Sequence, residues 1–583
     1  MKLKSSILVA AALCTTFLLS QPTGAQTPPK TAEQVDPNST KLGSITGRVL
    51  ADGQPVINAS IVAARLNSTN QTRAVPVNDN GDFEVKGLEP GVYRVSVTAP
   101  AYVNPPAESD QETLYRVGDS VALRMIRGGV ITGKVLGADE TPVLAVRVRA
   151  VMIRDANGKP PNTSVGRALD QITDDRGIYR IFGLPPGTYV VSAGGRGSSG
   201  YGINAFDNDA PTYAPSSRRD TAAEISIGSG EERTLNIRYR GEAGHVVSGN
   251  ATATGFPNDW ISINLTRLVD AAPDVRMSTS QNTNAKGFEF GGVADGDYLV
   301  WAYYASSSGD ATISEAKRIT VKGADVTGIE LAVKPLATVA GELVLQPSTL
   351  ETCKEKRRPL FDETLITLER SEKITQKELP QVPVYRTSQG APDKNGGFLL
   401  RNLGTGQYRL DVRFFAKYWY LRSINRRAAT ASSKDTAATQ ANDIAQSGLA
   451  LKLGDRITGV QITLAEGAAS LAGQVETAKD EKLPTQLFVY LVPAEKESGS
   501  DVLRFFAVQV DADGSFAVDH VPPGRYWSLA KVAAESELAS LGRLRLPDAA
   551  DARMKLRREA EAFRFEIDLK PCQNMSGYRV TFK

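Results

Sequence analysis

The sequence predicts an all-β fold, a tandem array of five β-sandwich domains with one short helix in the last domain. The main observation is a spacing: an aromatic residue is followed eight positions later by glycine and two positions beyond that by tyrosine. The five copies are Phe83–Gly91–Tyr93, Tyr179–Gly187–Tyr189, Phe288–Gly296–Tyr298, Phe398–Gly406–Tyr408 and Phe516–Gly524–Tyr526. A constant spacing in well-separated copies is typical of one small domain repeated in tandem.

Strand and turn signals around each copy support the same fold class. A small residue, a glycine and a polar residue open each repeat, and these glycines are Gly47, Gly133, Gly249, Gly341 and Gly473. Turn residues precede most of the aromatic residues, as in NDNG at 78–81. Proline before the second glycine, as in Pro90–Gly91, predicts a type II turn in which glycine adopts positive φ. Apolar residues then alternate with period two, as they do in strands.

The tyrosine after each turn is predicted to be a core residue. A buried ring whose hydroxyl bonds the backbone near the corner explains a tyrosine at a fixed offset after a turn. The alternative is a row of ligand-contacting tyrosines. It is the weaker interpretation, because five copies on equivalent strands are explained by five hydrophobic cores.

The repeats divide the chain into seven segments. We expect a signal peptide (1–25), a flexible linker (26–40) and β-sandwiches at 41–127, 128–240, 241–335, 336–465 and 466–583. The second sandwich has a Gly/Ser-rich insertion (194–220), and the fourth has polar insertions (350–392 and 424–447). Alternating segments such as 121–125 and 235–240 predict the last strand of a sandwich. A helix is expected from Pro547 to about Ala562, since proline and acidic residues suit a helix N-terminus.

The N-terminal segment predicts export to the periplasm or the extracellular space. Lys2 and Lys4 precede the apolar run 7–20, and Thr23 and Ala25 suit cleavage by signal peptidase. No later segment reaches the roughly 18 apolar residues that a membrane span needs. Without its signal the chain has 66 Lys and Arg against 65 Asp and Glu, which gives no electrostatic case for binding nucleic acid.

Two cysteines, Cys353 and Cys572, remain after the signal is removed. In an oxidising compartment they can pair and tie the C-terminal end to the fourth sandwich. They can also remain separate thiols, because distance in sequence says nothing about geometry. The sequence leaves both alternatives open.

The motifs resemble the carboxypeptidase regulatory-like domain. The shared pattern is small-Gly-x-Val, Asp-x-x-Gly-x-aromatic and Leu-x-Pro-Gly-x-Tyr, and Asp295 and Thr405 replace the proline in the third and fourth copies. This resemblance implies an immunoglobulin/prealbumin-like sandwich, related in form to Cna B-type repeats. The chain is also similar to large exported multidomain proteins of soil bacteria, at 211–232 and 420–451. At the level of fold, such proteins resemble carbohydrate-binding-like sandwiches.

Residues for catalysis or metal binding are not found in a recognisable pattern. The only histidines, His245 and His520, lie in different repeats without HxxE or HExxH spacing. We interpret each as a surface or strand histidine. No GxSxG motif is present. We therefore expect no catalytic residue, metal or cofactor.

Aromatic clusters are the one ligand-like feature. Sugar rings stack on flat exposed rings, so the candidates for ligand stacking are Trp301, Tyr303, Trp419, Tyr420 and Trp527. The favoured alternative is that these rings fill cores or the joints between sandwiches, because strand alternation points at least half of them inward.

These features predict an exported, non-catalytic scaffold of the binding or adhesion type. The expected partner is a polysaccharide or a component of the cell envelope, with neither nucleic acid nor a membrane span involved. Weak contacts on several domains would add through effective concentration. The alternative is an accessory module that docks to an exported hydrolase or peptidase.

Overall fold

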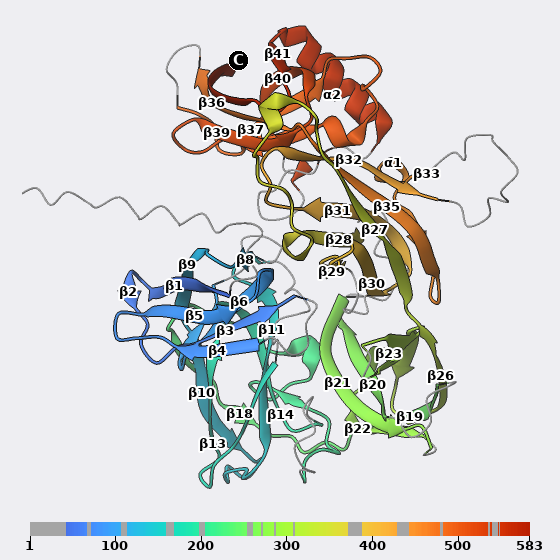
Figure 1. Cartoon of the computed structure of the whole chain (residues 1–583). Helices are drawn as coiled ribbons and strands as arrows, with labels where there is room; N and C mark the ends of the chain where they lie inside the picture. Colours follow the sequence, from blue (N-terminus) through green and yellow to red (C-terminus); the bar gives the residue numbers. More distant parts are fainter. Residues whose placement is uncertain are drawn as a thin grey trace, which may run out of the picture. The chain divides into compact units, whose positions relative to one another are not determined.

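The computed structural model describes most of the chain beyond residue 41 (Figure 1). The described ranges are 42–66, 72–105, 113–158, 168–196, 205–253, 260–269, 272–284, 287–306, 309–370, 387–427, 442–477, 482–534, 537–538, 546 and 549–582. The predicted signal peptide and linker lie outside these ranges, as do 197–204 of the second sandwich's insertion, 371–386 and 428–441 of the fourth sandwich's insertions, and Pro547 at the predicted start of the helix. No helix in the described ranges is long and apolar enough to cross a membrane.

The first sandwich consists of two layers. In one, β1 (Gly43–Ala51) pairs antiparallel with β5 (Asp82–Leu88) and parallel with β9 (Ser120–Arg127), and the short strands β2 (Gln54–Pro55) and β7 (Tyr102–Val103) flank them. The other runs in the order β4 (Thr72–Pro76), β3 (Ser60–Arg65), β6 (Val92–Thr98) and β8 (Leu114–Arg116). Ile45, Val49, Ile61 and Val85 are fully buried between the layers, as period-two alternation predicts.

The second sandwich repeats this plan. β10 (Gly129–Leu136) pairs with β13 (Ile178–Leu184) and, in parallel, with β17 (Glu232–Thr234) and β18 (Ile237–Arg238). The other sheet contains β12 (Ala168–Ile172), β11 (Arg147–Asp155), β14 (Gly187–Ala193), β15 (Thr212–Tyr213) and β16 (Ile225–Ile227), and a 3-10 turn, η1 (Arg219–Thr221), lies in the insertion. The strand predicted over 235–240 is limited to Ile237–Arg238. Residues beside it still bond β10, since the backbone N–H of Leu235 donates to the oxygen of Thr132 and that of Tyr239 to the oxygen of Leu136.

The third sandwich has its two layers joined at one edge. β19 (His245–Thr252) pairs with β22 (Phe288–Val293) and, in parallel, with β26 (Val326–Pro335). The second layer contains β21 (Ala272–Asn282), β20 (Trp260–Val269), β23 (Gly296–Ala305), β24 (Ala311–Ser314) and β25 (Lys317–Val321). The join arises because β24 pairs with both β23 and β26.

The fourth sandwich follows the same order with an extended first layer. β27 (Ala337–Gln346) lies between β30 (Gly397–Leu403) and the parallel strand β35 (Arg456–Glu466), which continues to β32 (Trp419–Arg426) and β33 (Asn442–Asp443). The second layer contains β29 (Thr387–Gly390), β28 (Leu365–Arg370), β31 (Gly406–Arg413) and β34 (Leu449–Leu451), with 3-10 turns η2 (Glu351–Cys353) and η3 (Phe361–Glu363) before it. A one-turn helix, α1 (Ile444–Ser447), was not predicted. The side chain of Asp443 caps it by accepting from two backbone N–H groups.

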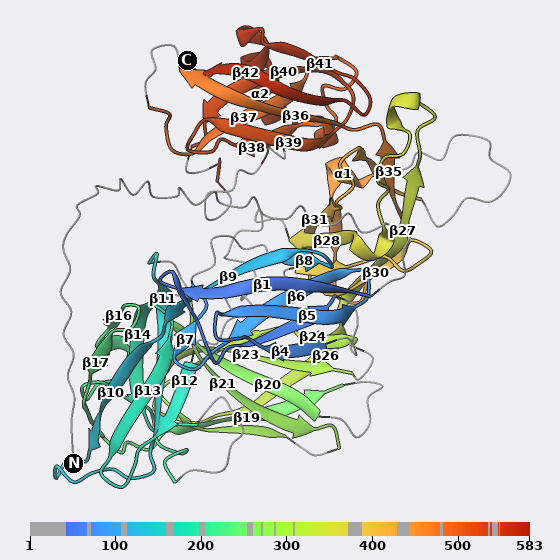
Figure 2. The ribbon, with the colours of Figure 1, turned by 60° about the vertical axis from the view of Figure 1, so that its left-hand side comes forward.

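The fifth sandwich carries the predicted helix (Figures 1 and 2). Its first layer contains β39 (Ser515–Val521), β36 (Ala469–Thr477) and the parallel β42 (Asn574–Phe582). Its second contains β38 (Phe506–Gln509), β37 (Leu487–Pro493), β40 (Gly524–Val532) and β41 (Glu566–Leu569), with η4 (Val502–Arg504) before it. The helix α2 (Ala550–Phe563) buries Leu556 and Ala560 against Phe488, Tyr490 and Leu529 on the outer face of that layer. The array of five sandwiches with a helix in the last is therefore confirmed.

Candidate functional site

All ten rings of the repeated spacing are buried. The first ring and the tyrosine of each copy are at most 6% exposed, and they lie in five separate cores. Burial raises the pKa of several of these tyrosines, among them Tyr189 and Tyr526, because it disfavours the phenolate. The prediction that the tyrosines are core residues is confirmed.

Each of these tyrosines is also bonded to the backbone four residues earlier. The hydroxyl groups donate to backbone oxygens at 2.6–2.8 Å in four copies: Tyr93 to Glu89, Tyr189 to Pro185, Tyr298 to Ala294 and Tyr526 to Pro522. Tyr408 has the corresponding backbone hydrogen bond at Gly404. The tyrosine therefore fixes the corner between two strands, which is a structural role.

The glycine that opens each repeat is needed for a close approach between strands. A Cβ atom on Gly47 would lie 2.1 Å from the oxygen of Val121 and 2.7 Å from the ring of Phe83. The other four opening glycines face a backbone oxygen of the parallel strand at 1.9–2.2 Å in the same way. The first aromatic ring thus packs onto a backbone without a side chain.

The glycine two positions before each tyrosine does not form the predicted type II turn. Such a turn needs a φ near +80°, but Gly91, Gly296, Gly406 and Gly524 have φ between +142° and +156°, and Gly187 has no positive φ. The structure gives a packing reason for the glycine. A Cβ on these four would lie 2.4–3.1 Å from the side chain of an arginine, which is Arg65, Arg267, Arg370 or Arg504 in order. A Cβ on Gly187 would lie 2.6 Å from the backbone oxygen of Arg154 and 3.2 Å from the side chain of Met152.

Two of the candidate stacking residues are buried, which contradicts a role in stacking on a ligand. Trp301 is 3% exposed because Ile313, Leu336 and Leu453 cover it where the third and fourth sandwiches meet. Trp419 is 0% exposed inside the fourth core. The alternative interpretation therefore applies to both residues: Trp301 fills a joint between two sandwiches, and Trp419 fills a core.

The other three candidates are only partly buried. Trp527 packs against the helix-bearing face of the fifth sandwich, and the guanidinium of Arg557 lies 5.0 Å from its ring centroid. Tyr303 packs beside Trp301, and Tyr420 is half-buried on β32. Trp260, which was not among the candidates, is 63% exposed at the start of β20. Its isolated position in the sequence gave no signal of exposure.

The two histidines have different surroundings. His245 is half-buried, and its Nε2 lies 3.3 Å from a carboxylate oxygen of Asp295. His520 lies on β39, and its Nδ1 is 2.9 Å from the backbone oxygen of Trp419 in the fourth sandwich. Its ring also contacts the ring of Phe414 edge-on at 4.6 Å. Burial lowers the pKa of His520. His520 therefore belongs to the contact between the last two sandwiches.

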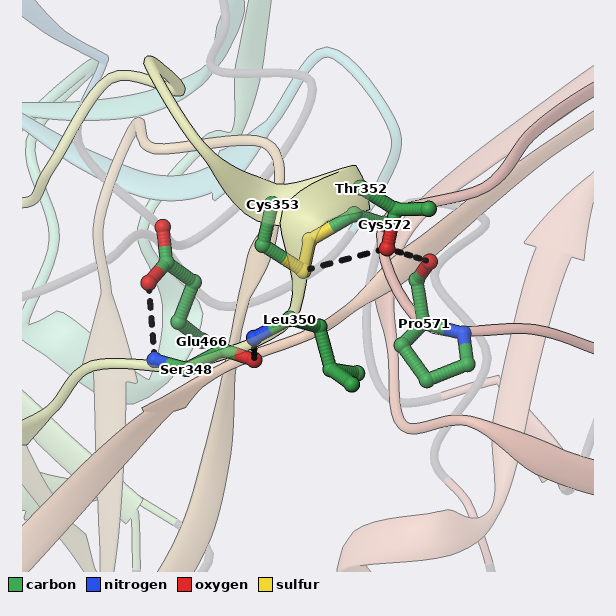
Figure 3. The surroundings of a disulfide bond; sticks show 7 residues. All are labelled: Ser348, Leu350, Thr352, Cys353, Glu466, Pro571 and Cys572. Atoms are coloured by element: carbon green, nitrogen blue, oxygen red, sulfur yellow. Dashed lines mark hydrogen bonds between the residues drawn. A yellow bond between two sulfur atoms is a disulfide. The ribbon is translucent and has the colours of Figure 1, made fainter.

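The same contact contains the two cysteines, whose sulfur atoms are bonded (Figure 3). The Cα atoms of Cys353 and Cys572 are 5.4 Å apart, and the bond spans 219 residues of sequence. Beside it, the hydroxyl of Thr352 lies 3.4 Å from the backbone oxygen of Pro571, to which it donates. Both cysteines are buried. The bond joins the fourth sandwich to the fifth, which is one of the two alternatives that the sequence left open.

A cluster suited to metal binding is not found: in the described ranges no three His, Cys, Asp or Glu side chains come together. The acidic turn at Asp511–Gly514 is closed by its own hydrogen bonds, since the backbone N–H and the hydroxyl of Ser515 both donate to Asp513. These bonds lower the pKa of Asp513. The hydrogen bonds within the turn at Asp511–Gly514 thus explain its acidic residues structurally.

The first sandwich is similar to a known protein family. Residues 44–111 match the family model of the carboxypeptidase regulatory-like domain. None of the curated protein sequences compared with this chain matches it.

Solved structures that resemble the chain include proteins of Gram-positive bacteria. The TIE protein of Bacillus anthracis is 16% identical to this chain, with a TM-score of 0.14. The match covers 50% of this chain and 51% of the TIE chain, so it spans about half the length of that protein. The minor pilin GBS52 of Streptococcus agalactiae is 15% identical over 34% of this chain and 96% of the pilin chain, with a TM-score of 0.19. The major pilin subunit BcpA of Bacillus cereus is 12% identical over 50% of this chain and 99% of the pilin chain, with a TM-score of 0.15. The family match is confined to residues 44–111, so the likeness to the carboxypeptidase regulatory-like domain is shown for the first sandwich alone.

Proposed function

We propose that this chain is an exported, non-catalytic scaffold of the binding or adhesion type. The observation that carries the proposal is the use of the repeated residues. In all five copies the first ring, the glycine and the tyrosine serve the core or the corner, and no repeated side chain is left to form an active site. Five such units supply spacing and repeated surface, which suits multivalent binding.

The contact between the fourth and fifth sandwiches supports both export and a scaffold role. A buried disulfide bond suits an oxidising compartment outside the cytoplasm. The bond, the His520 contact and the salt bridge of Lys417 with Asp519 at 3.6 Å all hold the two sandwiches together. A scaffold that carries load or spaces partners benefits from such a fixed joint.

The proposed ligand class is a polysaccharide or another component of the cell envelope. Because Trp301 and Trp419 are buried, the aromatic residue best placed to stack on a sugar ring is the exposed Trp260. Binding of the whole chain to arrayed glycans and isolated envelope fractions tests this class. Trp260→Ala should weaken binding about tenfold, or 1.4 kcal/mol, and Phe182→Ala, which removes an exposed ring from another sandwich, should leave binding unchanged. Equal binding by wild type and Trp260→Ala would rule out stacking at this residue.

A second candidate function is an accessory module that docks to an exported hydrolase or peptidase. The family match of residues 44–111 favours it, because that family is described as regulatory-like for a carboxypeptidase. Affinity purification of the tagged whole chain from the envelope and culture supernatant, followed by mass spectrometry, tests this candidate. A stoichiometric hydrolase that elutes with the chain would favour it over the scaffold.

A further inference from the structure

A small, partly open cavity lies between the second and third sandwiches, and three arginines line it, of which Arg196 is exposed. Its volume is about 30 Å³. Arg149 on β11 and Arg196 after β14 come from the second sandwich, and Arg267 on β20 comes from the third. Tyr213 of the insertion and Tyr298 of the third corner complete much of the wall. Three cations from two sandwiches therefore converge on a space for about one water-sized particle.

The positive charge around this cavity is only partly neutralised by carboxylates. Arg149 donates to both oxygens of Asp170, at 2.9 and 3.2 Å. Arg196 donates to a backbone oxygen, that of Glu289, at 3.4 Å. Arg267 has Asp220 at 3.9 Å, and the side chain of Asp220 is 75% exposed. Asp170 is shared with Arg147, whose Nη1 lies 3.8 Å from it, and Asp220 lies in solvent, so the two carboxylates leave at least one positive charge uncompensated.

Arg267 also has an unsatisfied donor. Its side chain is only 12% exposed, and its Nε–H is buried with no hydrogen-bond acceptor in the described part of the chain. A guanidinium group has donors and no acceptor, and it does not lose its proton in proteins. A buried donor without an acceptor costs about 1–3 kcal/mol. The equivalent Arg504, which packs on Gly524 in the same way, also has an unsatisfied Nε–H among the described residues. This donor is therefore a feature of the repeat, and the convergence of three guanidinium groups is what distinguishes the cavity.

We propose that this cavity binds a small monovalent anion of the size of chloride. A volume of about 30 Å³ suits one water-sized particle, which favours an ion of the size of chloride over a tetrahedral anion such as sulfate or phosphate. The uncompensated positive charge favours a monovalent anion over neutral water. The anion would bridge the guanidinium groups of the two sandwiches and stabilise the joint between them.

The repeat supplies a matched control for Arg267. Arg267 lies opposite Tyr298 in the strand register, and Arg370 lies opposite Tyr408 in the fourth sandwich in the same way. Both arginines also pack on the glycine before the tyrosine, Gly296 and Gly406. Arg267→Met and Arg370→Met therefore make the same change at the same place in a sandwich, and only the first removes a residue that lines the cavity.

Thermal unfolding of the whole chain at constant ionic strength tests the site, with sodium chloride exchanged stepwise for sodium gluconate. Wild type and Arg370→Met should show a saturable rise in Tm with chloride of about 2 °C, because a ligand that binds only the folded state stabilises it. Arg267→Met should show no such rise. An equal chloride response in Arg267→Met and Arg370→Met, or none in wild type, would overturn the proposal.

A second measurement holds even if Arg267→Met fails to fold. Crystals of the wild-type chain grown in sodium bromide should give an anomalous peak among Arg149, Arg196 and Arg267. A normal water peak there without anomalous signal would overturn the proposal and leave a buried water in the cavity.

Discussion

The Nδ1 atom of His520 lies 2.9 Å from the backbone oxygen of Trp419, so a histidine of the fifth sandwich is hydrogen-bonded to a strand of the fourth. Because a carbonyl oxygen only accepts, His520 donates from Nδ1, and its neutral form already satisfies this bond. Neighbouring charges are Asp519 on the same strand and Lys417 across the joint. The joint therefore contains a titratable group in its buried part.

Acidification should weaken this joint. Burial lowers the pKa of His520 in the folded chain, so as the pH drops through about 6.5 the unfolded chain binds protons before the folded chain does. The stability that the neutral ring contributes is therefore lost as the pH is lowered. The unfolding transition of the last two sandwiches, followed by calorimetry from pH 7.5 to 5, should move to lower temperature. His520→Gln should reduce that dependence, whereas His245→Gln should not. If the unfolding temperature of His520→Gln falls with acidification as much as that of wild type, other groups cause the effect.

Loss of the disulfide should destabilise the fourth and fifth sandwiches without affecting the first three. The bond closes a loop of 219 residues, for which chain entropy predicts at most about 5 kcal/mol. The Cys353→Ser/Cys572→Ser double variant should lower one calorimetric transition and leave the others in place. A uniform shift of all transitions would contradict this local role.

Removing one corner hydroxyl should have a measurable cost. Tyr526 donates to the oxygen of Pro522 at 2.8 Å and is fully buried. Tyr526→Phe should destabilise the fifth sandwich by about 1–2 kcal/mol, because a buried acceptor loses its donor. Denaturant unfolding measures the change, with Tyr420→Phe as a half-buried control expected to be near neutral. Equal effects of the two variants would argue against the corner bond.

The opening glycine should tolerate no side chain. Gly47→Ala would place Cβ 2.1 Å from the oxygen of Val121, so the parallel pair β1–β9 must separate. We expect destabilisation of about 3 kcal/mol or more. Gly53 has open space but a φ of +77°, so Gly53→Ala should cost only about 1–2 kcal/mol for its left-handed backbone. The comparison in denaturant separates close packing from backbone strain, and a smaller loss at Gly47 would contradict the packing account.

The sequence predicted what is local and repeated, and it missed what distant strands contribute. The buried tyrosine corner follows from a fixed offset after a turn, so Tyr93 and its four equivalents were predicted correctly. The glycine before each tyrosine was assigned to the wrong turn, because the arginine that packs on it comes from a different strand. In the fifth sandwich the strand position opposite Tyr526, where an arginine lies in other copies, is occupied by Pro493. The arginine there comes from η4 and is Arg504, which donates to the backbone oxygen of Pro523.

Burial at the joints could not be predicted for a similar reason. Strand alternation within one sandwich does not say whether a neighbouring sandwich covers the outer face. Trp301 lies on such a face, and Leu336 and Leu453 cover it from the following sandwich. The pairing of Cys353 with Cys572 also depends on how two sandwiches meet. Exposed Trp260 carried no pattern that distinguishes it from a core residue.

Hydroxyl-radical footprinting of the whole chain, read out by mass spectrometry, tests the central claim most directly. In the folded chain the five corner tyrosines should all be protected while Trp260 is modified rapidly; these tyrosines are Tyr93, Tyr189, Tyr298, Tyr408 and Tyr526. All five tyrosines should become reactive only on unfolding. Modification of these tyrosines at a rate similar to that of Trp260 would contradict five buried corners and would reopen a ligand-binding role for them.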